Sequence, residues 1–236
     1  MKITYLGNSG FALERDGGLL VIDCYDPRKH PLLKEESLKG MRYTTALVSH
    51  SHGDHYSPDI WTLFGAKFAA GYDVPTPLGV PKLRPGQTVL PNDMKVTAYG
   101  STDEGVSFHI VWDGVSIFHA GDLNDWHWRD EGGAEYAREA EAKFVKELAR
   151  IRQSVSHIDL AFFPVDPHMG SDYYRGVILF CDSMHPVRLM PMHFGRAFRP
   201  PEVFFEEVAP LTTLLLPPAV DSSILCPMCR EGKQPI

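Results

Sequence analysis

Three histidines and one aspartate lie within six positions of the sequence, in the segment His50-Ser51-His52-Gly53-Asp54-His55. Imidazole nitrogens and carboxylate oxygens are common ligands of zinc and other first-row metal ions. An exposed loop is the plainer alternative for an isolated pair of histidines, but this density of ligands favours a metal site. In an extended loop His50 and His52 can point the same way, while Asp54 and His55 turn towards a second position, so the spacing suits two metal ions.

The histidine segment stands between a predicted strand and a predicted helix. Residues 44–48, Thr-Thr-Ala-Leu-Val, form a short apolar run with β-branched residues, which predicts a buried strand. Ser57 suits the N-cap of a helix, Pro58 its first position and Asp59 its first turn. We therefore expect the histidines in a short loop on a rigid scaffold, where functional residues are often found.

The rest of the chain begins with strands and then alternates strands with helices. Asp113-Gly114 between two apolar runs predicts a hairpin. Strands are expected at 2–6, 11–14, 19–24, 67–71, 88–90, 94–99, 106–112, 115–119, 158–163, 187–190 and 211–216, and helices at 31–39, 134–151, 173–182 and 201–208. Because no change of composition marks a boundary, we expect one α/β domain over residues 1–236.

Composition narrows the class of protein. Hydrophobic residues make up 44% of the 236 residues, enough for a sizeable core, and no apolar run approaches the length of a transmembrane helix. The first residues enter a predicted strand without a signal-peptide pattern, so a cytoplasmic location is expected. Four cysteines are too few for a disulfide scaffold; Cys24 and Cys181 are expected to be buried, and Cys226 with Cys229 forms a single C-x-x-C.

The net charge of −7 argues against a nucleic-acid partner, because such binding draws on clustered lysine and arginine. No long basic run is present in the sequence. A small-molecule substrate is therefore the expected partner, no membrane partner is expected, and a homo-oligomer is compatible with the composition.

Two further candidate ligands follow predicted strands. Asp122 comes after Gly121, just beyond the apolar run 115–119, and His193 comes after Pro191-Met192 at the end of another strand. An aspartate in such a place usually caps a turn or helix, and a lone histidine usually has a packing role. Behind a histidine-rich loop, both become candidates for metal ligation.

Together these motifs resemble the metallo-β-lactamase superfamily over almost the whole chain. The resemblance rests on the opening Tyr5-Leu6-Gly7-Asn8-Ser9-Gly10-Phe11, the histidine loop, His119-Ala120-Gly121-Asp122 and Pro191-Met192-His193. Within the superfamily the chain is most similar to the branch of bacterial hydrolases related to L-ascorbate-6-phosphate lactonase. The resemblance to the superfamily implies a four-layer αβ/βα sandwich, with Asp122 bridging two metals and His193 as the last histidine ligand.

One ligand of the family is absent. The family places a further histidine about twenty residues before the bridging aspartate, where this chain has Ser101-Thr102-Asp103. Asp103 could supply an oxygen ligand instead, with Thr102 and Ser101 as weaker candidates. The protein could then hold one tight ion at Asp54, His55, Asp122 and His193 and a weaker one at His50, His52 and the oxygen ligand. Zinc, manganese and iron(II) all suit such a set.

These ligands predict a metal-dependent hydrolase that acts on a small lactone, ester or phosphoester, with anionic substrates among the candidates. Asp54 would orient or deprotonate the attacking water. His127 could protonate the leaving group and Trp126 could form an apolar wall, although a packed surface loop is the alternative for both. His168 is a further candidate substrate contact. Arg188, Arg196 and Arg199 near His193 could hold an anionic group or simply be solvated.

Two other functions remain open. One is a phosphodiesterase or ribonuclease of the same fold. The other is a metal-binding sensor or redox protein with a degenerate hydrolase site, which the missing histidine suggests. The presence of both Asp54 and Asp122 favours catalysis, because a purely structural metal site would not need both.

Overall fold

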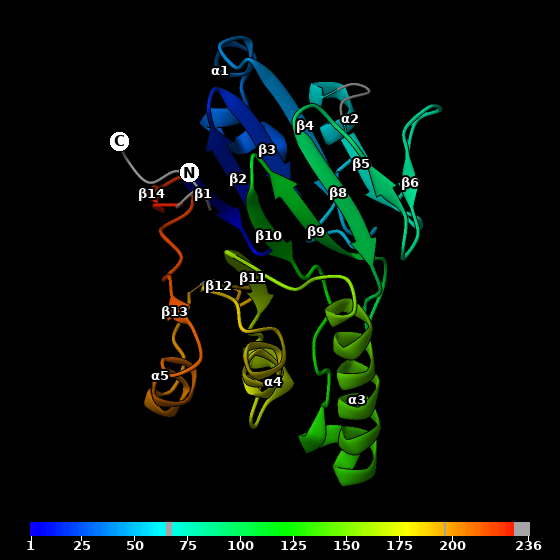
Figure 1. Ribbon diagram of the computed structural model, residues 1–236, viewed down its shortest axis with the longest axis vertical. Coiled ribbons are helices and arrows are strands. Elements are labelled where there is room, and N and C mark those ends of the chain that lie inside the picture. Colours follow the sequence, from blue (N-terminus) through cyan, green and yellow to red (C-terminus); the bar gives the residue numbers. More distant parts are fainter. Residues whose placement is uncertain (65–67, 196, 229–236) are drawn as a thin grey trace.

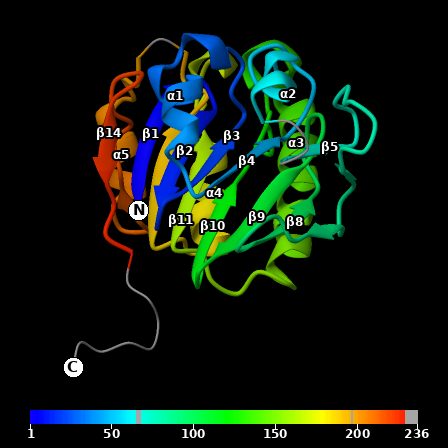
Figure 2. The same cartoon turned by 90° about the horizontal axis from the view of Figure 1, so that it is seen from above.

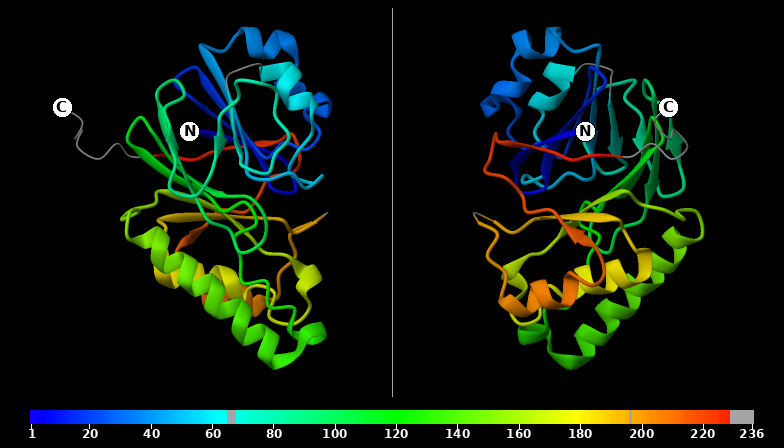
Figure 3. Two further views of the ribbon diagram at one scale, coloured as in Figure 1. Left: turned by 90° about the vertical axis from the view of Figure 1, so that its right-hand side faces the viewer. Right: turned by 60° about the vertical axis from the view of Figure 1, so that its left-hand side comes forward.

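Two seven-stranded sheets face each other in the computed structural model, which describes residues 1–64, 68–195 and 197–228. The first sheet has the order β14-β1-β2-β3-β4-β5-β6 and the second the order β13-β12-β11-β10-β9-β8-β7. Helices cover the outer face of each sheet, as the side views show (Figure 3), so the layers run helix, sheet, sheet, helix. The predicted α/β four-layer αβ/βα sandwich is confirmed.

The first sheet joins an antiparallel half to a parallel half. Strands β14, β1, β2 and β3 pair antiparallel, whereas β3 to β6 pair parallel. Its strands are β1 (Lys2–Gly7), β2 (Gly10–Arg15), β3 (Gly18–Ile22), β4 (Tyr43–Val48), β5 (Phe68–Gly71), β6 (Lys82–Leu83) and β14 (Ser223–Leu225).

The second sheet has the same mixed character. Strands β7 to β10 pair antiparallel, and β10 to β13 pair parallel. Its strands are β7 (Thr88–Val89), β8 (Met94–Tyr99), β9 (Ser107–Trp112), β10 (Val115–His119), β11 (Leu160–Pro164), β12 (Arg188–Met192) and β13 (Thr213–Leu214). Asp113 and Gly114 both have positive φ and form the predicted hairpin turn between β9 and β10.

Each sheet carries its own helices (Figure 2). On the first sheet lie α1 (Glu35–Lys39), α2 (Asp59–Phe64) and the 3₁₀ turns η1 (Pro27–Lys29) and η2 (Pro31–Leu33); the second sheet carries α3 (Arg129–Arg152), α4 (Arg175–Met184) and α5 (Glu202–Val208), with the turn η3 (Pro167–Met169) after β11. None of the described helices is both long and apolar enough to cross a bilayer.

The core divides in two because side chains alternate along each strand. Leu20 and Ile22 of β3 pack in the large cluster that both sheets share with α3 and α4. Leu19 and Val21 of the same strand face the other way, into a smaller cluster under α1 and α2. Every residue of β3 is buried, so this strand fixes the position of the sheet that carries the histidine loop.

Loops from both sheets meet at one edge of the sandwich. The chain leaving β4 contacts the chain entering β9, where Val106 N donates to Ser49 O (3.1 Å), and the chain leaving β12 contacts the β1–β2 turn, where His193 N donates to Asn8 O (3.2 Å). Gly105 permits the first contact, because a Cβ there would lie 2.2 Å from Ser49 O. The site is therefore assembled across the two sheets.

Candidate metal centre

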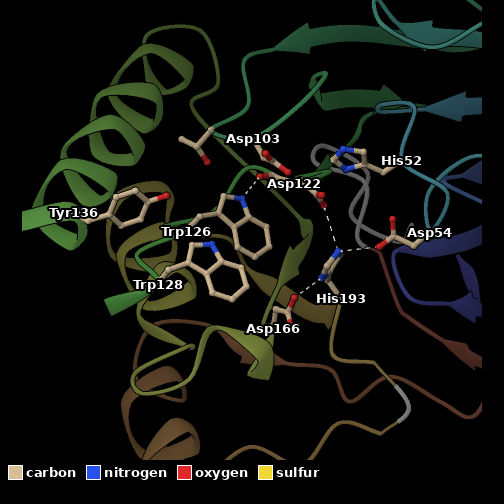
Figure 4. A pocket seen from close by; sticks show the side chains of 10 residues that line it. His52, Asp54, Asp103, Asp122, Trp126, Trp128, Tyr136, Asp166 and His193 are labelled. Carbon is tan, nitrogen blue, oxygen red and sulfur yellow. Dashed lines mark hydrogen bonds and ion pairs between the residues drawn. The ribbon is translucent and has the colours of Figure 1, made fainter. Parts of the chain in front are cut away.

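Three overlapping groups of histidine and aspartate side chains converge at this edge (Figure 4 shows those that line the cleft). Within each group the ligand atoms lie within 4.8 Å of one another. The groups are His50, His55 and Asp122; Asp54, His55 and His193; and His52, Asp103 and Asp122. The structure thus brings together all seven residues that the sequence suggested as metal ligands.

Asp122 stands between the histidines with one oxygen towards each. Its Oδ2 lies 3.2 Å from Nε2 of His50, and its Oδ1 lies 3.1 Å from Nε2 of His55. The side chain is almost fully buried just after β10, and Gly121 before it has a φ of +54°. A carboxylate with two oxygens aimed at separate histidine groups can serve two cations at once.

Asp54 and His193 close the second group from opposite sides. Nε2 of His193 lies 3.3 Å from Oδ2 of Asp54, and Nδ2 of Asn8 donates to the same oxygen (2.9 Å). His193 has a φ of +59°, an unusual conformation for a residue with a Cβ. The backbone after β12 is therefore held in a strained shape that aims the imidazole at Asp54 and Asp122.

The donor set fits metal ions on an observation independent of the family. Among the described residues, His55 Nε2 and Asp122 Oδ1 are fully buried and have no hydrogen-bond partner, although they lie 3.1 Å apart. Leaving buried polar atoms without partners is costly, so a cation between them would resolve the deficit. The mixture of imidazole and carboxylate suits zinc, manganese or iron(II).

Asp23 fixes two of these histidines from behind. The buried carboxylate accepts hydrogen bonds from His55 Nδ1 (2.9 Å), Ser49 N (2.7 Å) and Ser49 Oγ (2.6 Å). Nδ1 of His50 lies 2.9 Å from Ser49 Oγ and donates to it, since that hydroxyl gives its own proton to Asp23. Both rings therefore carry a proton on Nδ1 and direct Nε2 to the site, where a metal ion would take the place of a second proton.

Asp166 orients the imidazole of His193 through a hydrogen bond from its Nδ1. Its Oδ2 accepts from His193 Nδ1 (3.0 Å), and its Oδ1 accepts from Nδ1 and the backbone N of His168 (2.7 and 2.9 Å). Asp23 was absent from the predicted site. It follows β3 directly, but it lies inside the strand expected from the sequence at 19–24, so it offered no signal as a site residue.

Electrostatic coupling in the cluster is strong. Burial alone would lower the pKa of His55, but Asp122 and Asp23 on either side of the ring overcome it and raise that pKa to about 10. Burial alone would raise the pKa of Asp122, but His55 and His50 hold it well below its usual range. The hydrogen bond from His193 lowers the pKa of Asp54 to about 2. The carboxylates are therefore ionised and favour positive charge between them.

Asp103 lies in the segment where the resemblance predicts a further histidine ligand. It stands on the loop between β8 and β9, with His52 and Asp122 as its partners in the third group. Burial, and then the negative charge of Asp122, raise the pKa of the Asp103 carboxyl. A cation between the two carboxylates would remove that repulsion, which is consistent with an oxygen ligand at this position.

An open cleft of about 380 Å³ gives access to the centre. The cleft is lined by five of the candidate ligands, His52, Asp54, Asp103, Asp122 and His193, and by Thr102, Trp126, Trp128, Tyr136 and Asp166. Trp126 therefore lies in the cleft, as its suggested role in substrate binding requires.

His127 does not reach the cleft, and its suggested role as proton donor is wrong for this arrangement. The ring is fully buried; its Nε2 donates to Asp172 O (3.2 Å) and its Nδ1 accepts from Arg129 N (3.3 Å). Both nitrogens are thus used to hold the loop in place. The neighbouring Trp126 and Trp128 line the cleft. The sequence therefore located the right loop, but the side chain of His127 does not reach the site.

The remaining candidates lie around the cleft. His168 is largely exposed and is bonded to Asp166 beside the site, but it is not a lining residue. Arg188 and Arg199 do not line the cleft either. Arg196 and Cys229 lie outside the described residues, whereas Cys24, Cys181 and Cys226 are buried free cysteines.

Comparison with known proteins agrees with this geometry. No protein-family model matches the chain. The chain is 24% identical over 216 residues to a UPF0173 metal-dependent hydrolase of Thermococcus kodakarensis, covering 83% of this chain and 85% of the relative. A UPF0173 metal-dependent hydrolase of Ignicoccus hospitalis is 26% identical over 216 residues, with 83% of both chains covered.

Solved structures share the fold. Igni18, a metallo hydrolase from Ignicoccus hospitalis, has a TM-score of 0.66 at 20% identity and covers 94% of this chain and 97% of its own. CmlA, a diiron β-hydroxylase from Streptomyces venezuelae, has a TM-score of 0.61 at 11% identity and covers 94% of this chain but only 53% of its own. These similarities show that the chain has the metallo-β-lactamase fold, with the histidine and aspartate cluster at the edge of its two sheets.

Proposed function

We propose that the protein hydrolyses a small lactone, ester or phosphoester with water activated between two metal positions. The first position comprises His50, His52, Asp103 and Asp122, and the second comprises Asp54, His55, Asp122 and His193. The observation that carries the proposal is the placement of Asp122, whose two oxygens face different histidines at 3.2 and 3.1 Å.

Metal ions bound here would lower the pKa of water towards neutrality and polarise the substrate oxygen. Among the chain's own residues, Asp54 acts first; its side chain is half exposed and lines the cleft. Its Oδ2 is occupied by Asn8 and His193, so its Oδ1 is left to orient a water and accept its proton. Since His127 is buried elsewhere, we assign to Asp54 the return of that proton to the leaving group as well.

The identity of the metal depends on Asp103. With a carboxylate in place of a histidine, the first position is richer in oxygen and binds zinc less tightly than a three-histidine site would. We propose zinc at the second position and zinc, manganese or iron(II) at the first. The second position would then retain its ion when the first is emptied.

A direct test uses protein reconstituted separately with zinc, manganese and iron(II) and assayed against a lactone, a carboxylic ester, a phosphomonoester and a phosphodiester. Hydrolysis of at least one, abolished by Asp54→Asn and restored in no metal form of that variant, would support the proposal. Equal turnover by Asp54→Asn and the parent protein would refute the role of Asp54.

Oxygen chemistry at an iron pair is a second candidate, favoured by the carboxylate Asp103 and by the fold similarity to the diiron β-hydroxylase CmlA. Iron-loaded protein that consumes oxygen in the presence of a reductant, and hydrolyses none of the four substrates, would favour it over hydrolysis. A ribonuclease is less well supported, because no lysine or arginine lines the cleft within the described parts of the chain.

A further inference from the structure

An aromatic wall faces the metal ligands across the cleft. Trp126 and Trp128, from the loop after β10, lie nearly parallel, with ring centroids 6.4 Å apart and planes within 15°. Tyr136 of α3 extends the same side, and Figure 4 shows both indoles directed towards Asp122 and His193. Indole faces bind flat apolar groups through area and ring stacking.

Trp126 is tied to the ligand set. Its Nε1 donates to Asp122 O (2.7 Å), and its ring meets the imidazole of His193 edge-on at 5.8 Å. A flat group resting on this wall would therefore lie close to the reacting bond. A change at Trp126 would also disturb Asp122, so this residue cannot separate substrate binding from metal binding.

Trp128 is held in the cleft at the cost of backbone strain. Its φ of +34° and ψ of +44° are left-handed, which is a true outlier for a bulky residue. The helix start enforces this shape, since Glu131 N and Gly132 N both donate to Trp128 O (3.1 and 2.7 Å). Strain retained at a cleft residue is typical of a functional constraint.

Among the described residues that line the cleft, no lysine or arginine supplies a fixed positive charge. Among the described residues its lining contains four aspartates, Asp54, Asp103, Asp122 and Asp166, and no lysine or arginine. Metal ions would largely be neutralised by their own carboxylate ligands. An anionic group placed against the indoles would therefore meet no lysine or arginine among these described lining residues.

We propose that the cleft selects substrates whose hydrolysable bond carries a flat, uncharged aromatic ring, and that Trp128 is the residue that determines this preference. The inference rests on the proposed metal-dependent function and narrows its substrate class. The expected substrate is then a neutral aryl ester, lactone or related compound rather than an anionic metabolite.

Hydroxamates test the wall by binding alone, without a reaction. Zinc-loaded protein is titrated calorimetrically with benzhydroxamate, cyclohexanecarbohydroxamate, acetohydroxamate and 4-carboxybenzhydroxamate, which share one metal-binding group. We expect benzhydroxamate to bind about tenfold more tightly than acetohydroxamate, and both the cyclohexyl and the carboxylated compounds to bind more weakly than benzhydroxamate.

Variants at position 128 locate the preference. Trp128→Ala should reduce the affinity for benzhydroxamate to about that for acetohydroxamate, while the affinity for acetohydroxamate stays unchanged; Trp128→Phe should restore most of the difference. Trp128→Gly accepts the left-handed backbone without strain, so it should fold at least as well and still lose the preference. Phe205→Ala, an exposed aromatic on α5, is the matched control and should behave as the parent protein.

Each outcome decides the inference. Equal binding of the phenyl and methyl compounds by the parent protein, a preference that survives both Trp128→Ala and Trp128→Gly, or tighter binding of the carboxylated compound would overturn it. A phenyl preference in a protein that hydrolyses nothing would uphold the wall and reject the hydrolase. Failure of every hydroxamate to bind metal-loaded protein would reject both.

Discussion

Oδ1 of Asp122 lies 3.1 Å from Nε2 of His55, and neither buried atom has a hydrogen-bond partner among the described residues. The pair comes from different sheets, since Asp122 follows β10 and His55 lies on the loop after β4. A cation bound between them would join the two halves of the sandwich at its functional edge. Metal binding should therefore stabilise the fold as well as supply the chemistry.

Asp54→Asn should remove turnover while leaving the fold in place. The amide keeps the shape of the side chain but cannot accept a proton, and loss of a general base costs about 10²–10⁴-fold in rate. The measurement is kcat with the best substrate from the hydrolysis screen, together with metal content. A variant that keeps its metal and more than half of the parent kcat would contradict the role of Asp54.

Asp166→Asn should weaken the metal without removing a ligand. The carboxylate orients His193 through a 3.0 Å hydrogen bond, and loss of such outer partners lowers metal affinity about 10–100-fold. Competition with a chromogenic chelator measures the affinity. His168→Ala is the matched control because it touches only the other oxygen of Asp166. Equal loss in both variants would show that Asp166 does not act through His193.

Gly105→Ala should damage the site far more than Gly114→Ala. Both glycines have positive φ (+68° and +76°), so both substitutions carry a similar backbone penalty of about 1–2 kcal/mol. Only at Gly105 would the new Cβ collide with the histidine loop, 2.2 Å from Ser49 O and 2.4 Å from His50 Cβ. Thermal unfolding and metal content distinguish them; similar metal content in the two variants would show that the loop tolerates the displacement.

His109 on β9 predicts a specific dependence of stability on pH. Burial, and then the charge of Lys95, lower its pKa from 6.5 to about 4. The unfolded chain therefore binds this proton below about pH 6.5 and the folded chain only near pH 4, so the folded state loses stability as the pH falls through that window. The free energy of unfolding falls by up to about 3 kcal/mol across this window.

Urea unfolding of metal-free protein between pH 7.5 and pH 4.5 checks this expectation. The parent should lose more stability than His109→Gln, whose side chain does not titrate, and the two curves should run parallel above pH 7. A constant difference over the whole range would mean that His109 protonates equally in both states.

Local sequence signals predicted most of the fold. Apolar runs and turn residues located the central strands, and the helix expected at 134–151 is α3, which begins earlier, at Arg129, and is interrupted at Gly133. The helix expected at 31–39 is instead a 3₁₀ turn followed by a short α1. Strand β14 was not predicted, because its three residues become a strand only by pairing with β1, where Lys2 faces Leu225.

Only part of the candidate site could be predicted from the sequence. Asp103, Asp122 and His193 could be suggested from their order behind the histidine loop, because ligand order reflects topology. Asp23 falls inside the strand expected at 19–24, and only the fold places it behind His55. His127 misled because adjacency in sequence says nothing about the direction of a side chain, and its buried ring contacts Asp172 and Arg129 and does not line the cleft.

Metal stoichiometry tests the central claim most directly. Elemental mass spectrometry on untagged protein should find two equivalents in the parent protein, one in Asp103→Ala, which empties the first position, and at most one weakly held ion in Asp122→Ala, which damages both. One equivalent in the parent, unaffected by Asp103→Ala, would contradict the paired site, and no metal in protein reconstituted with zinc, manganese or iron(II) would contradict metal-dependent hydrolysis altogether.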